Sequence, residues 1–286
     1  NPMLNAANDW ITSHKIPLGL WMSDLVDLIR VHCTGLLDVI SGTITWGVDS
    51  FTALLQAVPP IVLIVLAVAG TAALKRRFLA PTLVGVGLLF ILNQGYWDDT
   101  MATLSLILFS TLISMLIGVP LGIAAAHRPW LDKAMHPLLD LMQTLPTFVY
   151  LIPTLILFGL GTVPGLISTI IFAIPAPIRM TEMGIASVSK TFLEAGEAFG
   201  ATPRQLLWKI ELPAALPMIR AGLTQCIMLS LSMVVIAALV GAGGLGVPVV
   251  RALNSVQVDV GFEAGFAIVI LAIILDRVCR SGDSGQ

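Results

Sequence analysis

Seven long apolar runs alternate with short charged segments along most of this chain. They are Val58 to Leu74, Phe78 to Leu92, Met101 to Ala126, Thr144 to Gly159, Val163 to Ile178, Met218 to Val240 and Phe262 to Leu275. A helix needs about 20 mostly apolar residues to cross a bilayer, where each backbone polar group must find its partner inside the protein. The pattern therefore predicts an all-α polytopic membrane protein, with some of its spans broken.

The segment before the first run has a different pattern. Between Trp21 and Leu55 apolar residues recur at helical spacing, but Asp24, Asp27, Asp38 and Asp49 interrupt them. A helix that lies along the outer interface, with tryptophans at headgroup depth, accounts for this pattern better than a helix that crosses the hydrocarbon core. If the segment did cross, the amino terminus would move to the cytoplasmic side.

Composition supports a location in lipid. Charged residues make up 11% of the chain and the mean hydropathy is +0.94, whereas soluble domains carry about 25% charged residues. The formal net charge of −2, without a basic face, argues against a nucleic-acid partner. Cys33, Cys226 and Cys279 have unrelated spacings, which predict neither a disulfide framework nor a metal site.

Lysine and arginine fall almost entirely on one side of the predicted membrane. If all seven spans are real, the residues that share this side are Lys75, Arg76, Arg77, Arg128, Lys133, Arg179, Lys190, Arg204, Lys209, Arg220, Arg277 and Arg280. Only Arg251 lies in an opposite loop, and Lys15 and Arg30 lie in the amino-terminal segment. Because short cytoplasmic loops hold the excess of positive charge, we expect the amino terminus outside and the carboxy terminus in the cytoplasm.

The spans contain almost no ionisable side chains, so they offer no internal relay for protons or sodium. The nearest approach to a phosphate-binding loop, Gly184 to Thr191, has Ser189 in place of the second glycine and follows no strand. No catalytic set or metal-ligand cluster stands out. We therefore expect this chain to be no enzyme and to depend on another protein for energy.

Prolines interrupt the apolar runs where a passage could form. Pro120 lies inside Gly118 to Gly122, a small-xxx-small pattern that predicts close helix packing, with a kink in the pathway as the functional alternative. Pro146 and Pro153, like Pro175 and Pro177, are expected to break the next two helices. Irregular backbone is tolerated at membrane depth only beside protein or a water-filled cavity. The candidate pathway residues are Pro120, Pro146, Tyr150, Pro153 and Pro175.

The stretch EAGEAFGATPRQLLWKIELP, Glu194 to Pro213, is unusually polar for this chain. Ser187 or Ser189 can cap a helix that Gly200 ends, and Thr202-Pro203 has the signature of a second start, which Pro213 then closes. This helical hairpin is apolar on one side, through Phe192, Ala195, Phe199, Leu206, Leu207 and Ile210. A solvated loop does not need this stripe, so the protein's own helices or a partner's groove must cover it.

These residues resemble the EAA motif of permease subunits from binding-protein-dependent ATP-binding-cassette importers. Glu194-Ala195-Gly196, Gly200 and the Ile210 to Pro213 stretch match the family pattern in type and spacing, except that Gly196 replaces alanine. In that family the segment is a pair of coupling helices seated in a groove of the ATPase subunit. The resemblance implies an ATPase-coupling site of Glu194, Ala195, Gly196, Gly200, Leu206, Trp208, Ile210, Leu212 and Pro213. Interfacial anchoring is the competing account of Trp208.

The chain is also similar to permeases for glycine betaine, proline betaine and choline, most closely in Asp140 to Arg179 and Leu231 to Gly246. This implies the type I importer fold in a bacterial cytoplasmic (inner) membrane, with a five-helix core, two amino-terminal spans and an interfacial helix. The expected regions are 1–57 outside or at the interface, 58–100 for the accessory spans, 101–280 for the core with coupling helices at about 187–213, and a tail at 281–286.

The resemblance implies import of a quaternary ammonium osmolyte. No aromatic cage for such a cation is evident within the spans, so we expect capture by a separate binding protein. Other expected partners are an ATPase subunit that holds ATP and Mg, a second permease copy and lipid, while this chain itself binds no cofactor. The Gly241 to Gly246 loop is expected to contact the second copy or the binding protein, or to reflect turn chemistry alone.

Two alternatives stay open. One is a permease of the same fold for another small solute, such as an amino acid, methionine or phosphonate. The other is a passive channel or facilitator, which would have no use for a coupling hairpin.

Overall fold

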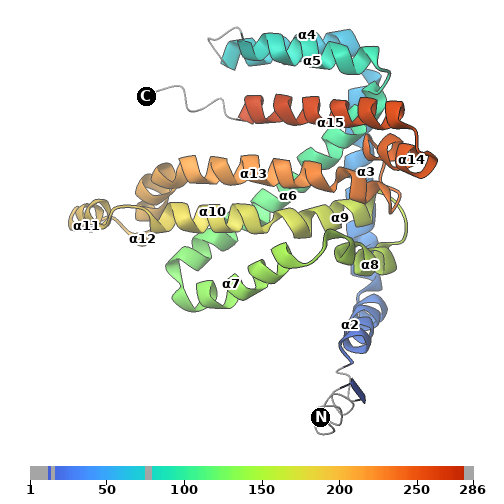
Figure 1. The fold of residues 1–286 in the computed structure, drawn as a ribbon. Coiled ribbons are helices and arrows are strands. Elements are labelled where there is room, and N and C mark those ends of the chain that lie inside the picture. Colours follow the sequence, from blue (N-terminus) through green and yellow to red (C-terminus); the bar gives the residue numbers. More distant parts are fainter. Residues whose placement is uncertain (1–11, 14–16, 75–78, 280–286) are drawn as a thin grey trace, which may run out of the picture.

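The computed structural model describes residues 12–13, 17–74 and 79–279, and Figure 1 shows their arrangement. Its helices are α2 (Leu18–His32), α3 (Thr34–Ala57), α4 (Pro60–Leu74), α5 (Leu79–Asn93), α6 (Trp97–His127), α7 (Pro129–Thr144), α8 (Thr147–Phe158), α9 (Thr162–Ala173), α10 (Pro175–Ala186), α11 (Lys190–Ala198), α12 (Pro203–Leu206), the π-helix η1 (Leu207–Glu211), α13 (Leu212–Ala238), α14 (Gly246–Ser255) and α15 (Val258–Cys279). Among the described residues every regular element is a helix, which confirms the all-α prediction. The expected tail at 281–286 lies outside this part of the chain.

Among the described residues, each of the seven apolar runs lies largely on helix. Four segments are long and apolar enough to cross a membrane, namely Trp97–His127, Thr162–Ala186, Pro203–Ala238 and Val258–Cys279. The bent pairs α3–α4 and α7–α8 raise this number to six if each pair is one span, and α5 is a shorter apolar helix.

The expectation of a single span over Thr144 to Gly159 is wrong. α7 ends at Thr144, and the axis of α8 is turned by 97° from that of α7. Pro146 causes the break, because its ring disfavours the helical conformation for Leu145, which is extended with ψ 134°. The 12 residues of α8 extend about 18 Å, which is short of the roughly 30 Å hydrocarbon core. α7, the other arm of this bent pair, escaped the search for apolar runs because it carries charged residues.

Pro175 and Pro177 do not break the fifth span. α9 and α10 form the 25-residue segment Thr162–Ala186 with one turn residue, Ile174, between them. Pro175 takes the first position of α10, where the missing N–H costs little. Pro153 lies inside α8, so Pro146 alone of the four expected breakers stands at a sharp bend.

Helices α6, α10 and α13 pack closely because glycines face their neighbours. A Cβ atom on Gly122 of α6 would lie 2.5 Å from the carbonyl oxygen of Ile178, and one on Gly184 of α10 would lie 2.9 Å from the Cβ of Met218. Real side chains do not approach so closely, so these positions hold the three helices together as one unit. The close packing predicted for Gly118 to Gly122 is confirmed.

Two further groups of helices surround this unit. α4 and α5 lie side by side along α15, where a Cβ on Gly87 would be 2.7 Å from Ile270 Cγ2 (Figure 1). α3 runs across the direction of the long helices, at 99° to α4, and its Phe51 ring lies 5.9 Å from that of Phe109 on α6. This orientation suits a helix in the membrane plane, and its interfacial position stays a prediction.

The fold has two distinct ends (Figure 1). The hairpin α11–α12 extends from one end, and the last turns of α15 point the same way. α8, α14 and α3 lie at the opposite end. We refer to them as the hairpin end and the α14 end.

Candidate functional site

The first helix of the hairpin ends in the way that the sequence predicts. Gly200 has φ +79°, the left-handed conformation that glycine adopts without strain. The backbone N–H of Ala201 donates to Gly196 O at 3.0 Å, and that of Gly200 donates to Glu197 O at 2.8 Å. These two bonds form a Schellman motif. Gly200 therefore sets the angle at which the chain leaves α11.

The second helix begins with a capping box. The side chain of Gln205 accepts from the Thr202 N–H at 2.8 Å, and Thr202 Oγ1 accepts from the Gln205 N–H at 3.4 Å. Pro203 takes the first helical position. The start predicted from Thr202-Pro203 is confirmed, and it fixes the turn that follows Gly200.

Gly196 lies where the two arms of the hairpin meet. A Cβ atom at this position would be 2.6 Å from Leu206 Cδ2 and 2.8 Å from Ile210 Cδ1. Both are the ends of flexible side chains, so the alanine of the family pattern would fit after small movements. Leu206 is buried as a result of this packing, and the hairpin covers part of its own apolar stripe.

Part of the stripe is uncovered, since Phe192, Ala195 and Phe199 are exposed while Leu207 and Ile210 are partly buried. Phe192 is 65% exposed, Phe199 94% and Trp208 63%. Glu194 and Ala195 are exposed as well. Single surface hydrophobics are common, but several large exposed aromatic side chains on one projecting hairpin are typical of a protein-contact surface.

Pro213 does not close the second helix. α12 continues through η1 into α13, and together they form one helical segment from Pro203 to Ala238. Proline has no N–H and its ring clashes with the carbonyl four residues earlier in an α-helix. The wider π-helix before it, in which Leu212 N–H bonds to Leu207 O, accommodates the ring. The hairpin is thus a direct extension of α13.

A buried carboxylate lies at this junction and was not singled out from the sequence. Glu211, the last residue of η1, is 8% exposed, and its two carboxylate oxygens lie 3.0 and 3.2 Å from Nε2 of His127 at the end of α6. The only signal in the sequence is a glutamate between two apolar motif residues, Ile210 and Leu212. Its partner is 84 residues away, and local patterns do not reveal it.

The candidate pathway residues do not share one surface of this chain. Tyr150 is buried, and its hydroxyl donates to the backbone oxygen of Met142, which ties α8 to α7. Pro175 is buried, Pro153 is partly buried, and Pro120 and Pro146 are exposed. The assignment of these residues to a pathway stays a prediction.

The glycine-rich loop Gly241 to Gly246 packs inward at the α14 end. Gly241 and Gly244 have φ +92° and +101°, and the N–H of Leu245 donates to Thr103 Oγ1 of α6 at 2.8 Å. A Cβ on Gly244 would be 2.4 Å from Thr103 Oγ1. Turn geometry and close packing explain these two glycines, while a Cβ on Gly243 would have nothing within 4 Å in this chain.

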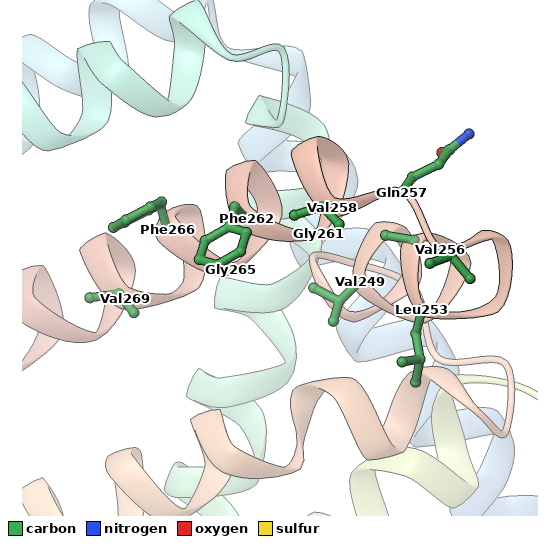
Figure 2. A pocket seen from close by; sticks show the side chains of 11 residues that line it. Val249, Leu253, Val256, Gln257, Val258, Gly261, Phe262, Gly265, Phe266 and Val269 are labelled. Carbon is green, nitrogen blue, oxygen red and sulfur yellow. The ribbon is translucent and has the colours of Figure 1, made fainter.

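An apolar groove of about 700 Å³ lies between α14 and α15 (Figure 2). Its lining residues are Val249, Ala252, Leu253, Val256, Gln257, Val258, Gly261, Phe262, Gly265, Phe266 and Val269. Gln257 supplies the only polar side chain among them. The groove has none of the convergent polar groups that orient a small ligand, so it is better suited to an apolar partner.

A group of charged residues joins α7 to α10. Asp132, His136 and Glu182 bring three potential ligand atoms within 4.8 Å of one another, and Arg179 lies 2.5 Å from Asp140. His136 is already 2.7 Å from Asp132 on its own helix. We describe the group as an ionic contact between the two helices, because its members are partly exposed and partner one another.

Comparison with known proteins identifies the class. A match to the family described as "Binding-protein-dependent transport system inner membrane component" covers residues 118–280, which include the whole hairpin. The chain belongs to this family.

Relatives extend the similarity over most of the chain. The permease is 46% identical over 269 residues to the glycine betaine/carnitine transport permease protein GbuB of Listeria monocytogenes, which covers 93% of this chain and 95% of that protein. It is 43% identical to the glycine betaine transport system permease protein OpuAB of Bacillus subtilis, over 93% of this chain and 94% of that protein. It is 40% identical to the glycine betaine/proline betaine transport system permease protein ProW of Escherichia coli K12, over 96% of this chain and 82% of that protein.

A solved structure supports the fold. A chain of the inward-facing MetNI methionine ABC transporter superimposes with a TM-score of 0.56 at 25% identity, over 68% of the permease and 96% of that chain. The resemblance to type I importer permeases is confirmed at the level of the fold and of the family.

Proposed function

We propose that this permease is the membrane passage of an ATP-driven importer for a quaternary ammonium osmolyte. The observation that carries the proposal is the projecting hairpin, which has EAA-type residues at its bend and exposed aromatic side chains on its surface. The hairpin continues into α13, so a force applied to it acts directly on a membrane helix. A passive channel has no need for this element.

The partner of the hairpin is an ATPase subunit that supplies ATP and Mg. Phe192, Phe199 and Trp208 enter a groove of this subunit, while Glu194 and Gly200 hold the bend. Closure of the ATPase dimer on ATP would move the hairpins and drive the permeases toward an outward-facing state. Hydrolysis would let them return.

The cargo is glycine betaine, proline betaine or choline, delivered by a substrate-binding protein at the α14 end. The support is that GbuB, OpuAB and ProW carry betaine names and match nearly the whole chain. The hairpin end then lies in the cytoplasm, which agrees with Lys190, Arg204 and Lys209 on the hairpin.

A second copy of the permease completes the passage, and the α14–α15 groove is the face we assign to it. Gly261 and Gly265 line this groove with the spacing that lets membrane helices approach closely. A Cβ on Gly265 would have nothing within 4 Å in this chain. Glycine weakens a helix by about 1 kcal/mol relative to alanine. Close contact with a helix of the second copy would account for a glycine at this position.

Reconstitution tests the function. Liposomes that contain the permease with its ATPase, supplied with binding protein and ATP, are expected to accumulate labelled glycine betaine against a gradient. Omission of ATP, ATPase or binding protein should each abolish accumulation. Uptake by the permease alone would instead indicate a passive channel, and preference for an amino acid would indicate a permease with another cargo.

A further inference from the structure

The contact between Glu211 and His127 lies where the hairpin joins the membrane helices. Glu211 ends η1, which connects α12 to α13, and His127 ends α6. We propose that these two side chains are positioning residues that transmit the movement of the hairpin to α6. The inference rests on the proposed coupling to an ATPase and adds a second route by which the hairpin acts on the membrane helices.

The hydrogen bonds of His127 define the contact. Its Nδ1 lies 2.8 Å from the carbonyl oxygen of Ile123, which can only accept, so Nδ1 carries a hydrogen. Its Nε2 faces both carboxylate oxygens of Glu211. The pair therefore shares one further proton, as imidazolium with carboxylate or as imidazole with carboxylic acid. In either form the ring is held at both nitrogens and links the two helices.

The surroundings make this contact stronger than a surface ion pair. An apolar cluster of Ile185, Ala215 and Ile219 lies beside it, with Ile123, Ala126, Leu207 and Leu212 packed against the cluster. His127 is about half exposed and Glu211 is almost covered. Loss of the histidine would strand a buried carboxylate, which is costlier than loss of an exposed partner.

The π-helix η1 explains why a contact to α6 matters at this point. A π-turn has less regular hydrogen bonding than an α-helix, so η1 is the most easily bent part of the segment that joins the hairpin to α13. Glu211 fixes the last residue of this turn to α6. Because Gly122 and Gly184 lock α6, α10 and α13 together, movement of the hairpin then reaches all three helices.

The test compares H127A, E211Q and the double variant H127A/E211Q in complexes with the ATPase. His32 supplies the matched control H32A, because it is exposed, its Nδ1 also faces a carbonyl oxygen four residues earlier, and it ends α2, which lies away from the hairpin (Figure 1). The measurements are co-purification with the ATPase, ATP hydrolysis with and without loaded binding protein, and the KM for ATP.

We expect H127A to bind the ATPase and to keep its basal rate and KM for ATP, while stimulation by loaded binding protein falls about tenfold. In the double variant, stimulation should fall much less than the product of the two single effects, because no buried charge is left without a partner. H127Q, whose amide can donate to Glu211, should restore most of the stimulation, and H32A should match the wild type.

Several results would overturn the inference. They are unchanged stimulation in H127A, multiplicative effects in the double variant, or a parallel loss of basal and stimulated rates, which would indicate a structural role alone. If H127A does not assemble, E211L replaces it, since it breaks the contact without leaving a buried charge, and wild-type stimulation in E211L would then refute the proposal. Failure of the proposed function is distinguishable, because the wild type itself would then show no stimulation.

Discussion

The permease exposes apolar side chains at both ends, but in two different settings. At the hairpin end, Phe192, Phe199 and Trp208 are exposed between charged residues such as Glu194 and Lys209. At the α14 end, the groove of Figure 2 is apolar except for Gln257. The hairpin can therefore stand in water before its partner arrives, whereas the groove requires lipid or another membrane helix.

Glycine has a different role at each of the two ends. Gly200 provides a backbone conformation that other residues adopt only with strain, so it shapes the hairpin from within. Gly265 has an ordinary helical conformation and open space beside it, so its value lies in what can approach from outside. The two ends should consequently respond to substitution in separate assays.

The largest effect is expected from G200V. A β-branched side chain in the left-handed conformation costs about 1–2 kcal/mol, so the turn between α11 and α12 should open. Insertion into the membrane should persist, while ATP hydrolysis stimulated by the loaded binding protein falls to the basal rate. G95V is the matched control, since Gly95 has φ +78° against +79° for Gly200 and lies far from the hairpin. Normal stimulation in G200V would mean that the contact is misplaced.

A smaller effect is expected from F199S. Loss of a central aromatic contact costs about 1–2 kcal/mol, so affinity for the ATPase subunit should fall about tenfold in a titration, with the thermal stability of the permease unchanged. L253S is the reciprocal variant, because Leu253 is 76% exposed at the groove. It should weaken permease self-association and leave ATPase affinity intact. Equal effects of both variants in both assays would remove the distinction between the two ends.

G265L should reduce self-association several-fold, as measured by cross-linking in the membrane, because the side chain blocks close approach of a second helix. ATPase affinity per permease should not change. G70L is the matched control, since Gly70 of α4 also has nothing within 4 Å. Wild-type cross-linking in G265L would place the second copy on another face.

The smallest effect is expected from G196A. The new methyl group displaces the ends of Leu206 and Ile210, while alanine favours the helix by up to about 1 kcal/mol. The two effects offset each other, so stimulated ATP hydrolysis and the melting temperature should stay close to wild type. A clear loss of stimulation would show that the arms of the hairpin need the closer contact that glycine gives.

Local signals in the sequence predicted the hairpin better than the spans around it. Gly200, Thr202 and Pro203 act through bonds to residues at most five positions away, and the structure has each of them in the expected role. The prediction that Pro213 closes the second helix was wrong, because a π-helix accommodates its ring and no local sequence pattern indicates that π-helix. The single span near Thr144 was wrong because Pro146 lies at a turn of 97° between α7 and α8, and a search for apolar runs detects no change of direction.

The sequence by itself determined the class of protein, the apolar helices and the bend of the hairpin, because hydropathy and turn chemistry depend on neighbours along the chain. Only the tertiary structure decided which glycines join α6, α10 and α13, how the hairpin merges with α13, and that Glu211 meets His127 across 84 residues. These features come from packing between distant helices. Their energies depend on contacts that exist only once the helices are assembled.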